Sequence, residues 1–253
     1  MCSLIHVLRI FLFCCVLVGS ALGDTSSALE NVQRARTLLG PDVWSRVVRV
    51  ENVARSSIYA RTVHALIFET SGILWFYTDV NGTQSLSLHR HNLAAEKADL
   101  LPLLQKIEPG FVRFEIVGSD AAKRIEKPAS IPNGCMIESL AAARKLVDEG
   151  VEVKRAALLS FYFNVNQTIH GHTLLGYESD DGAFLLDPAD PDRRIYVGDR
   201  LPDEPMVLAS KVDRPGVSIF KARTLSIPLP RSTAAMLAES GEAPRPTSPG
   251  MIN

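Results

Sequence analysis

The spacing of hydrophobic and polar positions changes several times along the chain, and each change predicts a helix or a strand. In the first half, apolar and aromatic runs of strand length alternate with segments of helical spacing. Asn81-Gly82 is a strong hairpin signal, because both residues tolerate a positive φ. The elements predicted there are a helix ending at Leu39, strands over Val63–Glu69, Ile73–Tyr77, Thr83–Leu88 and Phe111–Val117, and a helix over Leu93–Ile107 with Pro102 near a kink or in a first turn.

The second half opens with a predicted helix and continues as strands. Met136–Glu149 carries a single apolar stripe, and Gly150 follows where a left-handed residue commonly ends a helix. A helix followed by antiparallel strands is an α+β order, so we expect an α+β fold. The strands predicted after the helix are Ala156–Val165, His170–Tyr177, Ala183–Asp187, Arg193–Val197, Met206–Val212 and Val217–Phe220.

The two ends of the chain differ from the middle. Residues 1–23 carry one full charge, Arg9, and then an apolar run that ends in small residues, which is typical of a signal peptide cleaved near Gly23. A retained membrane anchor is the alternative. Residues 227–253 are rich in proline and predict a mostly disordered tail. Between them we expect a small α+β N-terminal domain over 24–120 and a second domain over 128–222, in a secreted or periplasmic protein with no stable membrane association after signal cleavage.

Composition narrows the range of partners and draws attention to one cysteine. The 253 residues are 46% hydrophobic and 22% charged, which excludes a disordered or coiled-coil chain. The formal charge is −1 and no basic block is present, so we expect no nucleic-acid partner. Of the four cysteines, only Cys135 lies outside the predicted signal peptide. A lone cysteine in an exported protein suggests a reactive thiol, although an inert buried cysteine is the alternative.

Three residues of the second half predict a site of nucleophilic chemistry. Cys135 begins a predicted helix, where unpaired amide groups stabilise a thiolate and offer an oxyanion hole. If the next hairpin turns at Asp180–Asp181, His172 and Asp187 lie diagonally on one face, within reach of each other. A three-residue loop would instead separate them. His170 shares that face, but it lies one pair farther from Asp187, so distance favours His172.

These residues resemble the pattern of the papain-like cysteine peptidase superfamily, with the bacteriocin-processing peptidases as the nearest comparison and the transglutaminase-like proteins as the second. The resemblance spans about residues 128–215 and implies a papain-like helix plus antiparallel sheet. It also implies Cys135 as nucleophile, His172 as base and Asp187 as the orienting carboxylate. The motifs that carry it are Asn133-Gly134-Cys135, Gly171-His172, Gly176-Tyr177 and Asp187-Pro188.

The same comparison leaves the oxyanion donor open. Many relatives place a glutamine about six residues before the cysteine, and Ala129 stands there in this chain. Asn133 either replaces that donor or serves as an N-cap or turn residue.

We therefore expect an exported cysteine hydrolase, peptidase-like or amidase-like, that acts on an amide or peptide bond through a Cys-His-Asp triad. Its expected partner is a peptide or protein substrate. We expect no cofactor and no metal, because the one suggestive pair, His89 and His91, has no cysteine or acidic third ligand beside it. The alternatives are a non-catalytic secreted binding module on the same scaffold and an exported protein whose cysteine is structural.

Overall fold

The computed structural model describes residues 25–87, 93–118, 130–212 and 217–229. The predicted signal peptide, the predicted joint over 123–128, the His89–His91 pair and the tail from residue 230 onward lie outside the described residues.

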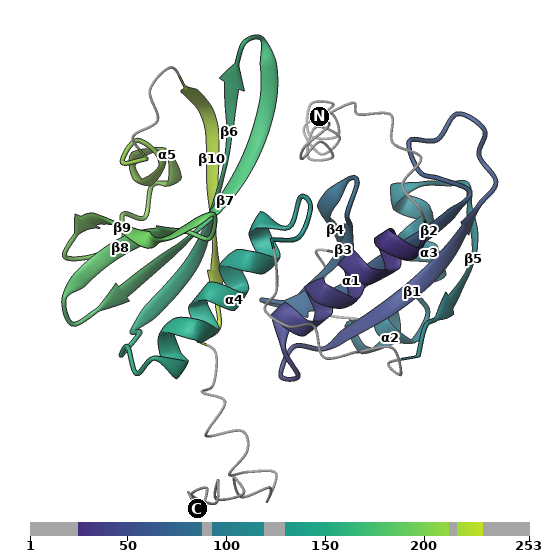
Figure 1. Cartoon of the computed structure of the whole chain (residues 1–253), viewed down its shortest axis with the longest axis horizontal. Helices are drawn as coiled ribbons and strands as arrows, with labels where there is room; N and C mark the ends of the chain where they lie inside the picture. The colour runs from purple at the N-terminus through teal and green to yellow at the C-terminus, as the bar shows by residue number, and fades with distance from the viewer. Residues whose placement is uncertain (1–24, 88–92, 119–129, 213–216, 230–253) are drawn as a thin grey trace, which may run out of the picture.

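Two five-stranded antiparallel sheets dominate the described chain (Figure 1). The first, sheet A, has the order β4-β3-β2-β1-β5, and the second, sheet B, has the order β10-β6-β7-β8-β9. The strands of sheet A are β1 (Ser45–Asn52), β2 (Thr62–Thr70), β3 (Ile73–Thr78), β4 (Gly82–Ser87) and β5 (Phe111–Ile116). Those of sheet B are β6 (Arg155–Val165), β7 (Thr168–Ser179), β8 (Gly182–Asp187), β9 (Asp190–Gly198) and β10 (Ser218–Ile227).

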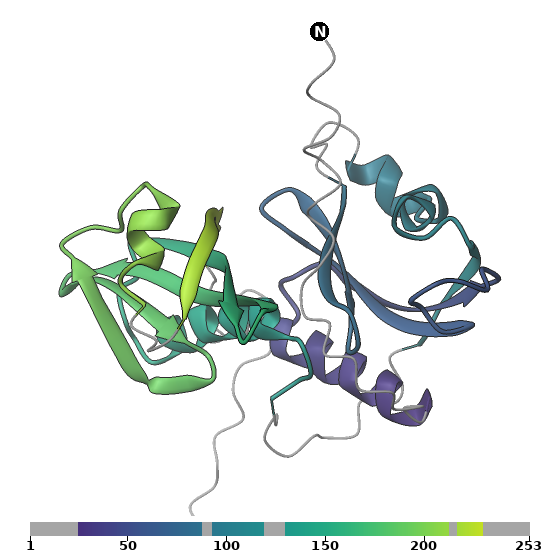
Figure 2. The ribbon, with the colours of Figure 1, turned by 90° about the horizontal axis from the view of Figure 1, so that it is seen from above.

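Two longer helices lie between the sheets, and shorter ones lie outside them. Figures 1 and 2 both show α1 (Thr25–Leu39) beside sheet A and α4 (Cys135–Asp148) beside sheet B, with the two helices adjacent. Outside sheet A are α2 (Leu93–Ala98) and α3 (Leu101–Ile107), and α5 (Pro205–Ala209) lies against the outer face of sheet B.

The central hydrophobic cluster includes residues of both sheets and both inner helices. Phe68 and Tyr77 of sheet A, Leu146 of α4 and Leu175 of sheet B are at most 2% exposed and belong to this one cluster. Two further clusters fill the outer faces, one under α3 and one under α5. Each sheet is therefore covered on both faces, which explains why many of its strands read as nearly continuous apolar runs.

The predicted fold class is wrong. We expected an α+β fold with a papain-like helix plus antiparallel sheet, whereas the described residues form a β-rich fold of two antiparallel sheets with few helices. Among those residues, only α1 and α4 are longer than 7 residues. Two strand errors explain part of the difference, because β1 was not predicted and β10 continues to Ile227 instead of ending at Phe220.

Most other predicted elements are confirmed within a residue or two, with one change of type. The predicted strand over Met206–Val212 is instead the short helix α5, which Pro205 opens with its fixed φ. A short apolar run does not by itself separate a strand from a helix segment. The predicted helix over Leu93–Ile107 is divided into α2 and α3, and Pro102 lies in the first turn of α3.

Candidate active site

Cys135 is the first residue of α4, and its thiol is free and partly buried. The N-cap is Gly134, so no side chain caps the first turn. The amide groups of that turn point toward the space in front of the helix, where they favour negative charge. A Cβ added at Gly134 would lie 2.1 Å from Cγ1 of Ile131, so any other residue type there would force the Ile131 side chain to move.

The loop that leads into Cys135 is held by residues of the N-terminal half. Asn133 has a φ of 53°, a left-handed conformation that asparagine tolerates. Its Nδ2 donates hydrogen bonds to the carbonyl oxygens of Asp79 (2.8 Å) and Val80 (3.0 Å) in the β3–β4 turn. The hydroxyl of Tyr77 donates to the Pro132 carbonyl at 2.8 Å. The position of the thiol therefore depends on sheet A as well as on α4.

These bonds settle the two roles considered for Asn133. Both hydrogens of its side-chain amide are donated to carbonyl oxygens of the β3–β4 turn. The amide therefore has no hydrogen left for an oxyanion, and Asn133 is a residue of the turn before α4. Ala129 lies outside the described residues. The main-chain N–H groups of the first turn of α4, Cys135 included, lie beside the sulfur and are candidate oxyanion donors.

One turn after Cys135, the helix is tied to the strand that carries His172. The buried hydroxyl of Ser139 donates to the carbonyl oxygen of Thr173 at 3.1 Å. The Thr173 hydroxyl in turn lies 3.0 Å from the Ser160 hydroxyl in β6. This chain of bonds runs from α4 through β7 to β6 and limits sliding of the helix along the sheet.

His172 and Asp187 meet as the hairpin register requires. The β7–β8 turn has two residues, Asp180 and Asp181, and Leu175 pairs with Leu186. The three-residue loop that would have separated His172 from Asp187 therefore does not occur. His172 Nε2 lies 3.0 Å from Asp187 Oδ1, and each side chain is 16% exposed. The same carboxylate oxygen accepts the Ala189 N–H at 3.0 Å, which fixes its orientation.

The imidazole of His172 lies between the carboxylate and the thiol. Burial disfavours its charged form, but hydrogen bonds to Asp187 and Cys135 outweigh burial and raise the pKa of His172 to about 9. Because Nε2 faces Asp187, the other ring nitrogen, Nδ1, is the one left for Cys135. The ring also packs edge-on against Phe161, its cross-strand neighbour, at 5.9 Å between centroids.

His170 has a different environment, although it comes from the same strand. Its ring stacks on Phe163 with 5.5 Å between centroids. The hydrogen bond to the Asp187 carboxylate belongs to His172, and so does the influence of the Cys135 thiol on the imidazole pKa. The structure therefore favours His172 over His170 as the partner of Cys135, in agreement with the distance argument from the sequence.

A cavity of about 130 Å³ opens beside the sulfur. It lies between the edge strands of the two sheets, β4 and β10, and Cys135 forms part of its wall. Sequence reasoning missed this wall, because its residues come from six separate segments and carry no local motif. The other lining residues are Ile73, Trp75, Thr83, Gln84, Ser85, Asn133, Met136, Leu158, Ser160, Tyr162, Thr173, Arg223, Thr224 and Leu225.

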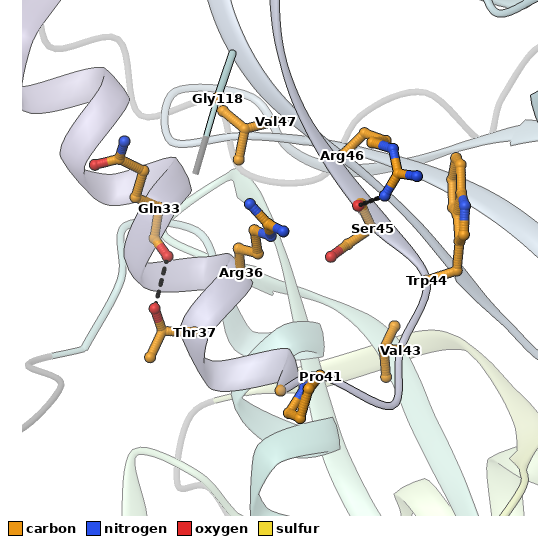
Figure 3. Close-up of a pocket in the computed structure, with 11 residues that line it drawn as sticks. Gln33, Arg36, Thr37, Pro41, Val43, Trp44, Ser45, Arg46, Val47 and Gly118 are labelled. Carbon is orange, nitrogen blue, oxygen red and sulfur yellow. Dashed lines mark hydrogen bonds between the residues drawn. The ribbon is translucent and has the colours of Figure 1, made fainter. Parts of the chain in front are cut away.

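A larger hollow, of about 510 Å³, lies between α1 and the start of β1 (Figure 3). None of the described residues that line it is a cysteine, histidine or carboxylate. Arg46 in its wall donates to the Ser45 carbonyl and lies over the Trp44 ring, 5.3 Å from the centroid. This hollow offers no nucleophile and no acid–base pair, so the smaller cavity is the candidate active site.

Comparison with known proteins adds no relative: no protein-family model, curated protein or solved structure matches the chain. Within the described ranges, no cluster of three or more histidine, cysteine or acidic side chains is placed to hold a metal ion. None of the helices in the described part of the chain has the length and apolar character needed to cross a bilayer.

Proposed function

We propose that this protein is a cysteine hydrolase that cleaves an amide or peptide bond through Cys135, His172 and Asp187. One observation carries the proposal: a partly buried imidazole is hydrogen-bonded to a carboxylate, and a thiol at a helix N-terminus is close enough to help raise the pKa of that imidazole. A nucleophile, a base and a group that orients the base are the parts that covalent acyl transfer needs.

The charges of the group suit attack by sulfur. With a pKa of about 9, His172 is mostly protonated at neutral pH. A cation beside sulfur and the amide groups of a helix N-terminus both stabilise a thiolate, which is the nucleophilic form. Asp187 keeps the imidazole in place and balances its charge.

In the first half of the reaction, the thiolate attacks the carbonyl carbon and a C–S bond forms. The carbonyl oxygen becomes an oxyanion, which the N–H groups at the start of α4 stabilise. When the C–O double bond re-forms, the C–N bond breaks and the imidazolium gives its proton to the departing amine. The products of this half are the free amine and a thioester on Cys135.

In the second half, neutral His172 takes a proton from water while the water oxygen attacks the thioester. A C–O bond forms, the C–S bond breaks, and the carboxylic acid leaves as the thiolate is restored beside the imidazolium. The atoms and charges return to their starting arrangement, so no cofactor is required.

The test is the rate at which iodoacetamide alkylates Cys135 between pH 5 and 9, followed by peptide mass mapping. At pH 6 an ordinary thiol with a pKa near 8.5 is less than about 1% thiolate. We expect the native protein to react at pH 6 about 100-fold faster than His172→Ala. The matched control is His170→Ala, from the same strand, which should react like the native protein.

An acyl donor separates catalysis from reactivity alone. With 4-nitrophenyl acetate, we expect Cys135 to gain one acetyl group and then to lose it with time. A thiol that reacts only after unfolding, or equally fast in His172→Ala, contradicts the proposal. Rapid alkylation without acetyl transfer indicates a non-catalytic binding module instead.

A further inference from the structure

The cavity beside Cys135 has the composition of a side-chain binding pocket. Its apolar lining comes from sheet A, α4 and sheet B, and small hydroxyl side chains also line it. Trp75 and Leu158 in the wall are 7% and 2% exposed, so the wall is part of the folded core and not a loose surface hollow. The apolar lining residues are Ile73, Trp75, Met136, Leu158 and Leu225, and the hydroxyl residues include Thr83, Ser85, Ser160 and Thr173.

Two residues of the cavity wall carry a buried side-chain polar atom without a hydrogen-bond partner among the described residues. Nε1 of Trp75 and Oγ1 of Thr83 have no hydrogen-bond partner within the described part of the chain. Buried polar groups in native proteins are usually paired, so unpaired groups call for an explanation. Both residues line the cavity, although these two atoms are themselves buried in its wall.

The edges of both sheets also face this cavity. Thr83 to Ser85 in β4 and Arg223 to Leu225 in β10 are consecutive residues, and all of them line it. Successive side chains of a strand point to opposite faces, so three consecutive residues contribute main-chain edge as well as side chains. In the described sheets, β4 and β10 are end strands. Free strand edges bind extended polypeptide through main-chain hydrogen bonds.

The volume sets the size of the group that fits. An apolar cavity of roughly 150 Å³ binds benzene, so a cavity of about 130 Å³ admits a group somewhat smaller than a benzene ring. Leucine, isoleucine and methionine side chains have four heavy atoms, whereas tryptophan has ten. An apolar wall also disfavours a charged side chain, because burial removes its hydration.

We infer that the cavity binds the side chain of the substrate residue whose carbonyl Cys135 attacks, and that this residue is leucine, isoleucine or methionine in an extended peptide. This inference rests on the proposed cysteine hydrolase function and adds a substrate preference to it. The pocket and the sulfur share a wall, so the residue that fills the pocket brings its carbonyl to the thiolate.

The experiment measures alkylation of Cys135 by four N-acetyl-aminoacyl chloromethyl ketones that differ only in side chain: glycine, leucine, lysine and tryptophan. Sulfur displaces chloride in each case, so the intrinsic reactivity is similar. Burying a leucine side chain stabilises a complex by about 2 kcal/mol, which is about thirty-fold in rate. We expect the leucine reagent to react about thirty-fold faster than the other three.

Variants that enlarge the pocket should change the preference in one direction. Ile73 and Leu225 are partly buried and line the cavity. In Ile73→Ala and Leu225→Ala, we expect the tryptophan reagent to gain about tenfold relative to the leucine reagent. Ile116→Ala is the matched control, because Ile116 is 59% exposed on β5 at the opposite edge of sheet A. It should leave the preference unchanged.

The outcomes separate this inference from the proposed function. Equal rates for all four reagents, with fast His172-dependent alkylation by iodoacetamide, overturn the pocket assignment and leave the hydrolase proposal intact. A preference for the lysine or tryptophan reagent also overturns it. A Cys135 that resists every reagent until unfolding overturns both.

Discussion

The two sheets have similar surroundings but carry different parts of the site. Each has five antiparallel strands, a long helix on its inner face and one or two short helices on its outer side. Sheet B carries the acid–base pair, His172 and Asp187, whereas sheet A carries the turn and the tyrosine that hold the loop before Cys135. Similar architecture therefore does not imply similar chemistry, and the first half of the chain belongs to the site even though it supplies no reacting group.

Two partly buried histidines, one in each sheet, have pKa values that shift in opposite directions. Burial lowers the pKa of His64 in β2, Arg49 lowers it further, and the nearby Asp79 only partly offsets these effects. His172 is also buried, but hydrogen bonds to a carboxylate and a thiol raise its pKa to about 9. Burial alone favours a neutral imidazole, and direct bonds to its neighbours reverse that preference.

The largest effect should come from breaking the hydrophobic cluster that the two halves share. Leu146 of α4 is 2% exposed in that cluster, so Leu146→Ala should lower the free energy of unfolding by about 3 kcal/mol. The two tryptophans of the chain, Trp44 and Trp75, both belong to the first half. In Leu146→Ala, the urea midpoint measured by tryptophan fluorescence should fall together with the midpoint measured by circular dichroism.

A fluorescence midpoint that stays unchanged while the circular dichroism midpoint falls would show that the halves unfold independently. The control is Val112→Ala on β5, where the valine is 44% exposed and its truncation should change both midpoints little.

The second effect concerns the pH dependence of stability. The folded-state pKa of His172, about 9, lies above the ordinary value of 6.5, so protonation of His172 stabilises the folded protein. This contribution is complete below pH 6.5, is lost as the pH rises toward 9, and is at most about 3 kcal/mol. In Asp187→Asn, urea unfolding measured at pH 6 and pH 9 should show a smaller difference than in the native protein.

Asp190→Asn is the matched control for that experiment, because Asp190 is an exposed strand residue that pairs with Asp187 across β8 and β9. Asp190→Asn should show the same difference in stability between pH 6 and pH 9 as the native protein. If Asp187→Asn also shows the native difference, the Asp187 carboxylate does not hold the His172 imidazole in its charged form.

The smallest effect tests the brace that sheet A provides. Asn133→Gly removes two hydrogen bonds but keeps the left-handed backbone, so it should cost about 1 kcal/mol of stability and slow iodoacetamide alkylation of Cys135 several-fold. Asn133→Ala should cost about 1 kcal/mol more, because alanine strains that backbone. Equal alkylation rates in the native protein and both variants would show that the turn does not position the thiol.

Local patterns predicted most elements and the pairing of His172 with Asp187, because the hairpin register follows from a two-residue turn. They did not predict β1, although Val47, Val48 and Val50 are apolar and fully or almost fully buried there. They gave the wrong fold class, since the number of strands in each sheet depends on pairings between distant segments. The brace at Asn133 and the cavity wall were also missed, because both depend on the contact between the two halves.

The close approach at Gly134 has an evolutionary consequence. A side chain at that position requires Ile131 to shift or to be replaced by a smaller residue, because Ile131 already occupies the space. Positions 131 and 134 should therefore covary in related sequences. Sequences with a bulky aliphatic residue at 131 should have glycine at 134, including sequences in which Cys135 is replaced.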